Sequence, residues 1–331
     1  MDTRTDIGVL LLQLGTPEAP TAPAVRTYLR EFLMDRRVVD LSRILWWPIL
    51  NAFVLPRRPA RSAQLYQRVW TADGSPLAVT SGAQAEGLEQ ALNRSSDSAP
   101  RVRVAVAMRY GSPSIQAAID ALVDQGCERL FAFPMYPQYA GATTGSSLER
   151  LFACLGSRRV VPSVRVLPPY FDDAEYITAL AGSIRRGWDR WNPDHLLLSF
   201  HGLPQRYADA GDPYPAHCHE TARAVAQALD WPADRLTVSF QSRFGREEWL
   251  KPYTDAVLRD LAARKVPKLA VACPGFTADC LETLEEIGIT GREMYHACGG
   301  GEYRLLPCLN ADPMWIDAMA TMTARELEGW R

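Results

Sequence analysis

Short apolar runs that end in Gly or Pro recur along the chain in two matching sets. "VLLLQLGTP" at 9–17 resembles "LLLSFHGLP" at 196–204, because each is an apolar run followed by Gly and Pro with one residue between them. The three matched pairs are 9–17 with 196–204, 104–112 with 236–245, and 129–137 with 268–276. Gly and Pro terminate regular structure, so each run predicts a short, fully buried strand.

Helix-like segments separate these strands, at 114–125, 218–229 and 252–264. Strands that alternate with helices are typical of parallel sheets covered by helices. The repeat therefore predicts an α/β fold of two similar Rossmann-like, doubly wound domains with parallel sheets, facing a central cleft. The predicted bounds are 1–160 for an N-terminal domain, 161–310 for a C-terminal domain, and 311–331 for a C-terminal helix packing back on the first domain.

The first half carries an insertion, predicted at about 30–75, that the second half lacks. It contains "LSRILWWPILNAFVLPRRPAR" at 41–61, an apolar stretch followed by three arginines. One interpretation is a core helix with a polar end. The other is an exposed apolar lip over the cleft, with cations at its rim, suited to a large flat ligand bearing carboxylates or to a membrane surface.

The composition indicates a globular protein and argues against several classes of partner and metal site. The 331 residues are 47% hydrophobic and 22% charged, which is typical of a globular protein. A formal net charge of −2 argues against a nucleic-acid partner, which would require a basic surface. Seven cysteines without a C-x-x-C pair indicate neither a zinc ribbon nor a disulfide framework. With no signal peptide and no apolar run long enough to span a bilayer, we expect a cytoplasmic protein.

Nucleotide-binding motifs are absent from the sequence, but two other segments carry residues that could bind a ligand or a metal ion or transfer protons. Neither G-x-G-x-x-G nor a P-loop occurs, and "GATTGSS" at 141–147 is interpreted as a turn and helix cap. His201 ends the strand at 196–204, at the sheet edge where α/β proteins bind ligands. A further predicted helix begins after another strand and carries Glu282, Glu285 and Glu286 in its first turns. These carboxylates are interpreted either as a row on one side of the helix, facing the site, or as an ordinary solvated face. "HCH" at 217–219 is interpreted as surface, because residues two apart on a helix face different ways.

Five segments together resemble the ferrochelatase family, most closely its proteobacterial type, over about residues 7–325. They are "LLLQLGTPEAPTAPAVRTYLREFLMDRRVVD", "PMYPQYAGATTGSSLE", "LLLSFHGLPQRYADAGDPYP", "SFQSRFGREEWLKPYTD" and "CPGFTADCLETLEEIG". The resemblance implies a lyase-type metal chelatase that inserts Fe²⁺ into protoporphyrin IX, releasing two protons, in the terminal step of heme biosynthesis. Protoporphyrin IX and Fe²⁺ are then its substrates, and peripheral contact with the inner face of the cytoplasmic membrane is a further expectation.

The resemblance also assigns roles to individual residues. It implies that His201 and Glu282 are catalytic and hold the metal, with Glu286 as a further candidate ligand. It implies an inner-pocket pair, Arg109 and Tyr110, a pocket tryptophan, Trp249, and a residue on the opposite macrocycle face, Leu14. The positions matching the family's contacts to porphyrin propionates are Arg58, Arg61, Ser75 and Ser242.

Two departures from the family pattern change what is expected. Cys280 stands where many relatives have a second histidine, which argues against a two-histidine mechanism. Some members of the family carry a C-terminal [2Fe–2S] cluster, but no cysteine follows Cys308 in this chain, so we expect no iron–sulfur cluster. We also expect that no other cofactor is required. Two alternatives remain at this point: a cobalt chelatase of another tetrapyrrole, which would typically present extra histidines, and a non-catalytic tetrapyrrole carrier with His201 as axial ligand.

Overall fold

The structure, a computed structural model, describes residues 6–94, 100–245 and 247–330. The chain divides into two compact units. Unit 1 comprises Met1–Tyr136, Gly141–Pro168 and Met319–Arg331, and unit 2 comprises Pro137–Ala140 and Pro169–Ala318. The division thus falls inside the last helix, α12 (Pro313–Glu326).

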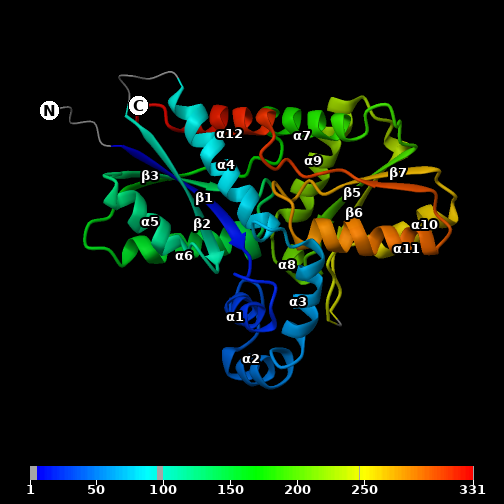
Figure 1. The fold of residues 1–331 in the computed structure, drawn as a ribbon, viewed down its shortest axis with the longest axis horizontal. Coiled ribbons are helices and arrows are strands. Elements are labelled where there is room, and N and C mark those ends of the chain that lie inside the picture. Colours follow the sequence, from blue (N-terminus) through cyan, green and yellow to red (C-terminus); the bar gives the residue numbers. More distant parts are fainter. Residues whose placement is uncertain (1–5, 95–99, 246, 331) are drawn as a thin grey trace. The chain divides into compact units, whose positions relative to one another are not determined.

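Unit 1 is built on a four-stranded parallel sheet in the order β2-β1-β3-β4. Figure 1 labels β1, β2 and β3 of this sheet. The strands are β1 (Ile7–Gly15), β2 (Val102–Tyr110), β3 (Arg129–Pro134) and β4 (Ser163–Val166). Helices α5 (Ile115–Asp124) and α6 (Ser146–Gly156) pack their apolar faces on the sheet, and α4 (Pro76–Asn93) packs against β1 and β2. A short π-helical turn, η2 (Gly141–Gly145), leads into α6.

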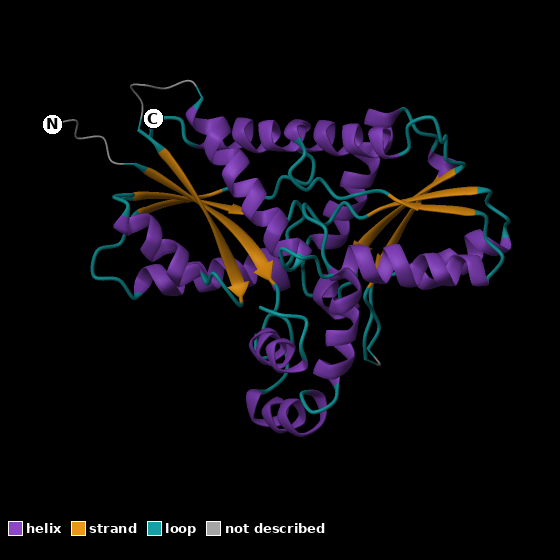
Figure 2. Ribbon diagram, in the orientation of Figure 1, coloured by secondary structure: helices purple, strands orange, loops and turns teal. Residues whose placement is uncertain are grey.

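Unit 2 repeats this arrangement with the order β6-β5-β7-β8, again fully parallel. Figure 2 shows the strands of the two sheets in orange with helices beside them. Its strands are β5 (His195–His201), β6 (Leu236–Gln241), β7 (Lys268–Ala272) and β8 (Glu302–Leu305). Its helices are α7 (Ala174–Gly187), α8 (Gln205–Asp209), α9 (Tyr214–Leu229), η3 (Ala233–Arg235), α10 (Thr254–Ala263), η4 (Glu282–Gly291) and α11 (Arg292–Ala297). The three matched sequence pairs are the first three strands of each sheet, so the prediction of two similar α/β domains is confirmed.

The insertion in unit 1 forms a small helical group after β1. It consists of α1 (Ala22–Leu33), α2 (Arg43–Ile49), the π-helical turn η1 (Leu50–Val54) and α3 (Arg58–Val69). Helices α1 and α3 pack together, and Leu33, Leu50 and Leu55 are buried. Within the described residues, no helix is long and apolar enough to cross a membrane.

The interpretation of "HCH" as surface is wrong for two of its three residues. Cys218 is fully buried on the inner side of α9, which packs against α7. The ring of His217 stacks on Phe171 at 3.8 Å between centroids, and its Nδ1 accepts the Tyr139 N–H at 3.2 Å. Only His219 is exposed, because the helix turns the three side chains in different directions.

Candidate active site

His201 lies at the carboxyl end of β5 with one ring nitrogen already occupied. Its Nδ1 is 2.7 Å from the backbone carbonyl oxygen of Gly202. A carbonyl oxygen only accepts hydrogen bonds, so Nδ1 carries a proton and donates it to this oxygen. The side chain is half-buried, and its ring lies edge-on to Phe276. In the neutral ring this tautomer leaves Nε2, and not Nδ1, as the atom that can accept a proton.

The next residue must be glycine for this arrangement to exist. A Cβ on Gly202 would come within 2.6 Å of the Gln241 carbonyl oxygen and 3.0 Å of the Trp249 ring. Trp249 is buried and packs edge-on to Phe244, with ring centroids 4.9 Å apart. Its indole N–H has no hydrogen-bond partner within the described residues. The tryptophan that the resemblance implies therefore lies against the backbone of Gly202, the residue that follows the histidine.

The carboxylates follow on η4, which is a π-helix and not the α-helix that the sequence suggested. Its wider i→i+5 turn changes which side chains share a face. Glu282 and Glu286 are half-buried, whereas Glu285 is buried and accepts a hydrogen bond from the Thr290 hydroxyl at 3.0 Å. The prediction that all three would lie on one side of a helix is therefore wrong for Glu285.

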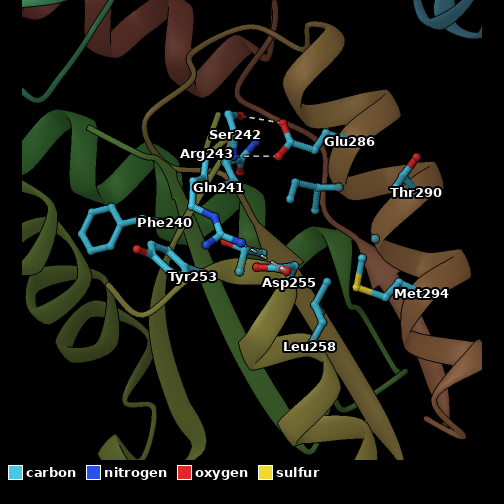
Figure 3. A pocket seen from close by; sticks show the side chains of 13 residues that line it. Phe240, Gln241, Ser242, Arg243, Tyr253, Asp255, Leu258, Glu286, Thr290 and Met294 are labelled. Carbon is cyan, nitrogen blue, oxygen red and sulfur yellow. Dashed lines mark hydrogen bonds and ion pairs between the residues drawn. The ribbon is translucent and has the colours of Figure 1, made fainter. Parts of the chain in front are cut away.

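Glu286 is held by Ser242, at the end of β6. The backbone N–H of Ser242 donates to Oε1 at 2.7 Å, and its hydroxyl donates to Oε2 at 2.5 Å (Figure 3). Burial raises the pKa of Glu286, and the charge of Glu282 adds to this, while the Ser242 hydrogen bonds and His201 act in the opposite direction. Ser242 adopts a left-handed backbone conformation (φ 64°), which turns both of its donors toward the carboxylate.

A cavity of about 200 Å³ lies beside this carboxylate, between β6, α10 and η4 (Figure 3). Glu286 and Ser242 form one end, and Arg243 and Asp255 carry opposite charges across part of its wall. The remaining lining residues are Phe240, Gln241, Tyr253, Thr254, Leu258, Ile287, Thr290, Gly291 and Met294.

Arg109 and Tyr110 lie in unit 1, in a charged cluster at the end of β2. Arg109 Nε donates to the Ser146 hydroxyl at 2.7 Å, and its Nη2 pairs with the Asp35 carboxylate. The same carboxylate oxygen accepts from the Tyr110 hydroxyl at 2.9 Å and the Ser146 hydroxyl at 2.5 Å. Asp35 lies between α1 and α2, so this cluster ties that segment of the helical insertion to the end of β2 and the start of α6.

The environment keeps Asp35 ionised. Burial opposes its charge, but hydrogen bonds from Ser146, the Arg37 N–H and Tyr110, with the Arg109 charge, together lower the pKa of the carboxyl. The pKa of Tyr110 is raised, chiefly by its burial. Neither Asp35 nor Ser146 was singled out from the sequence. The only feature of the sequence that could have pointed to them is that they lie inside two segments that carried the resemblance, "REFLMDRRVVD" and "GATTGSS".

The other sequence-predicted residues lie elsewhere in unit 1. Arg58 begins α3 and Arg61 follows it by nearly one turn; partial desolvation and the Arg61 charge lower the pKa of Arg58. Ser75 precedes α4 and is buried, with its hydroxyl 2.8 Å from that of Thr16. The backbone N–H of Leu14 donates to the Tyr136 hydroxyl at 2.5 Å.

Each unit therefore assembles part of the predicted set. Unit 2 brings together His201, Ser242, Trp249, Glu282 and Glu286, and unit 1 brings together Arg109 and Tyr110. Within the described ranges, no group of three or more His, Cys, Asp or Glu side chains is arranged to hold a metal ion.

Comparison with known proteins identifies the family. The family model described as Ferrochelatase matches residues 6–327, nearly the whole chain. The chain belongs to the ferrochelatase family. Ferrochelatase from Chromobacterium violaceum is 47% identical over 324 residues, covering 98% of this chain and 88% of that protein. Ferrochelatase from Escherichia coli strain SMS-3-5 is 47% identical over 322 residues, covering 97% and 98%.

Solved structures support the fold. SirB from Bacillus subtilis with Fe³⁺ matches with a TM-score of 0.55 at 12% identity, covering 97% of this chain and 95% of that chain. The sirohydrochlorin chelatase SirB from Bacillus subtilis subspecies spizizenii in complex with cobalt gives a TM-score of 0.52 at 16% identity, covering 77% and 94%. At these identities the likeness concerns the fold alone.

The comparisons confirm the resemblance read from the sequence. The chain is a ferrochelatase-type metal-chelating lyase, and the ferrochelatase relatives favour neither the cobalt chelatase nor the non-catalytic carrier.

Proposed function

We propose that this ferrochelatase inserts Fe²⁺ into protoporphyrin IX with His201 as the principal base. The observation that carries the proposal is the hydrogen bond from His201 Nδ1 to the Gly202 carbonyl, which leaves Nε2 as the proton acceptor. Insertion replaces two pyrrole N–H protons by one Fe²⁺, so charge balances when both protons leave. An imidazole, whose ordinary pKa is about 6.5, accepts a proton near neutrality and can release it again.

Glu282 and Glu286 are the proposed partners of the entering metal. Oxygen ligands hold Fe²⁺ less firmly than a cage of thiolates would, so they can pass it to the porphyrin nitrogens. Burial raises the pKa of Glu286, which also suits that carboxylate to receive the second proton. No resident cofactor and no iron–sulfur cluster enter this scheme.

The remaining predicted residues are proposed to bind and bend the macrocycle. Leu14, which is half-buried, and Trp249 are the proposed apolar contacts of the ring, although Trp249 is buried in this structure and would have to become more exposed to make one. Bending the ring exposes its nitrogen lone pairs at the expense of binding energy from the rest of the ring. Arg58 and Arg61, two neighbouring cations, are the proposed partners of the propionates. Arg109 and Tyr110 are the proposed inner-pocket pair. Ser242 binds Glu286 in this structure, and Ser75 is buried beside Thr16, so both would have to change partner to reach a propionate.

The experiment that tests this function is anaerobic metallation of protoporphyrin IX, followed by absorbance. His201→Ala should lower kcat at least about 100-fold, within the range expected for a general base. Porphyrin binding, measured by fluorescence, should change less than about threefold, because the macrocycle is bound mainly through apolar area. His219→Ala, which removes an exposed histidine from α9, is the matched control. Loss of less than tenfold in kcat would remove His201 from the role of principal base.

We further propose a cytoplasmic protein attached peripherally to the inner membrane face through the helical insertion. The support is a row of exposed apolar side chains on α2 and η1, with Ile44 85%, Leu45 68%, Trp47 58% and Phe53 62% exposed. Arg57, Arg58 and Arg61 follow in sequence and could meet anionic headgroups. Trp46 is different, because it is half-buried and its indole N–H donates to the Leu33 carbonyl at 2.7 Å.

This proposal is tested by sedimentation with anionic vesicles. Trp47→Ser with Phe53→Ser should reduce binding at low salt at least about fivefold, corresponding to roughly 1 kcal/mol. Phe152→Ser, which removes an exposed aromatic side chain from α6, is the control and should bind as the wild type does. Equal binding of all three proteins would refute membrane attachment through the insertion.

A further inference from the structure

Gln241 is a buried side chain at the end of β6 that connects three elements of unit 2. It is 3% exposed. Its Oε1 accepts a hydrogen bond from the Ser199 hydroxyl on β5 at 2.7 Å and a weaker one from the Cys273 thiol, just after β7, at 3.7 Å. Its Nε2 donates to the backbone carbonyl of Glu282 at 2.9 Å. Because that carbonyl can only accept, the orientation of the amide is determined.

The acceptor side of Gln241 is anchored by a buried chain of hydroxyls. Ser199 Oγ lies 2.9 Å from Thr254 Oγ1, which lies 2.8 Å from Ser239 Oγ. All three side chains are buried, and they come from β5, the start of α10 and β6. A buried network in which each member has a partner restricts rotation of its members. Gln241 is therefore held in one orientation by the sheet.

The donor side of Gln241 attaches to the first residue of η4. Glu282 opens the π-helix, so the hydrogen bond fixes the point from which the helix carries Glu286 onward. Gln241 is also the register partner of His201 in the neighbouring strand. One side chain thus connects the strand end that carries the histidine to the helix start that carries the carboxylate.

The following residue attaches to the same helix one turn later. Ser242 binds the Glu286 carboxylate through its N–H and hydroxyl. Gln241 binds the main-chain carbonyl of Glu282, so this hydrogen bond does not involve the Glu282 carboxylate. The two successive residues therefore contact η4 at two points four residues apart. This spacing fixes both the start of the helix and its rotation about its axis.

We propose that Gln241 is a positioning residue for metal insertion, which sets the distance between His201 and Glu282 by fixing the start of η4. The proposal rests on the proposed function of these two residues. Gln241 acts through the helix start and contacts neither substrate in this role. A displacement of about 1 Å between catalytic groups can lower a rate on the order of 100-fold, so losing this hydrogen bond should affect turnover more than stability.

The test compares three variants. Gln241→Met keeps the side-chain length and removes all three side-chain hydrogen bonds, those from Ser199 and Cys273 and the one to Glu282. Gln241→Glu keeps the acceptor for Ser199 and replaces the donor to Glu282. Thr237→Val, on the same strand, removes the 2.9 Å hydrogen bond between Thr237 Oγ1 and His195 Nε2 at the other end of the sheet, so it is the matched control for losing one side-chain hydrogen bond.

Both Gln241 variants should lower kcat at least tenfold, about 1.4 kcal/mol. They should raise KM for Fe²⁺ several-fold and leave KM for protoporphyrin within twofold, whereas Thr237→Val should change none of these more than twofold. Hydrogen exchange of the amides of residues 282–286 should become faster in both Gln241 variants and not in the control. If Gln241→Met does not fold, Gln241→Glu carries the same comparison.

Two results would overturn the proposal: unchanged exchange at 282–286, or a kcat loss no larger than that of Thr237→Val. The exchange measurement needs no catalysis. If the wild-type protein failed to metallate protoporphyrin, the proposed function would fail while the exchange result still reported on the attachment of η4.

Discussion

Replacing Asp35 by Asn should destabilise unit 1 strongly, although the two side chains have nearly the same shape. The carboxylate oxygen Oδ2 accepts from Arg109, Tyr110 and Ser146 at once. The side chains of Asp35 and Arg109 are only 7% and 16% exposed, so solvent screens this pair weakly. Removing one partner of a buried ion pair costs about 3–5 kcal/mol, because the remaining charge is left without compensation.

The cost converts into a measurable shift in melting temperature. For a domain of this size, 1 kcal/mol corresponds to roughly 2–4 °C, so Asp35→Asn should melt about 6–20 °C below the wild type. Differential scanning calorimetry measures this directly. The variant should also raise KM for protoporphyrin, since Arg109 loses the carboxylate that orients its guanidinium.

Asp120→Asn is the matched control, because Asp120 pairs with Arg158 at a more exposed position in the same unit. The side chain of Asp120 is 48% exposed, and exposed ion pairs contribute about 0–1 kcal/mol. The control should therefore shift the melting temperature by no more than about 4 °C. If both variants melt within 2 °C of the wild type, the Asp35 cluster does not contribute several kcal/mol to the stability of unit 1.

Two further predictions concern the carboxylates of η4. Burial raises the pKa of Glu286, so the stability that this group contributes is complete below the ordinary carboxyl pKa and is lost as pH rises through the raised value. Glu286→Gln should therefore compare more favourably with the wild type in thermal melts at about pH 8 than at about pH 4, and equal differences at both would contradict this. Glu282→Gln should lower kcat at least about 100-fold with little change in melting temperature, whereas Glu285→Gln, at a buried site, should chiefly lower the melting temperature; equal kcat losses would indicate only a diffuse acidic field.

The strands could be predicted because their signals are local. Apolar runs ended by Gly and Pro mark buried strands whatever surrounds them, and the repeat of such runs gave the two sheets. Gly15 shows why the signal is reliable: its φ is 111°, and a Cβ there would lie 1.8 Å from the Tyr110 carbonyl oxygen. Backbone geometry of this kind leaves a direct trace in the sequence.

The site was less predictable because its geometry depends on side chains from distant segments. The spacing of Glu282, Glu285 and Glu286 fits an α-helix, and nothing local in it indicates the wider turn that buries Glu285. Gln241 and Asp35 are polar residues whose function comes entirely from their partners. The insertion at 41–61 fitted both a core helix and an exposed lip, and only packing around Leu50 and Leu55 separates its inner from its outer side.

The shared topology of the two sheets has a consequence for how such a chemistry can arise. Leu14–Gly15 at the end of β1 corresponds to His201–Gly202 at the end of β5, and in both units a carbonyl at the end of the neighbouring strand leaves room only for glycine. The same close backbone contact is therefore present in both units, while the residue before the glycine can differ between them. If the halves descend from a duplicated ancestor, one copy could keep an aliphatic side chain there and the other acquire an ionisable ring, with no change in the scaffold of either.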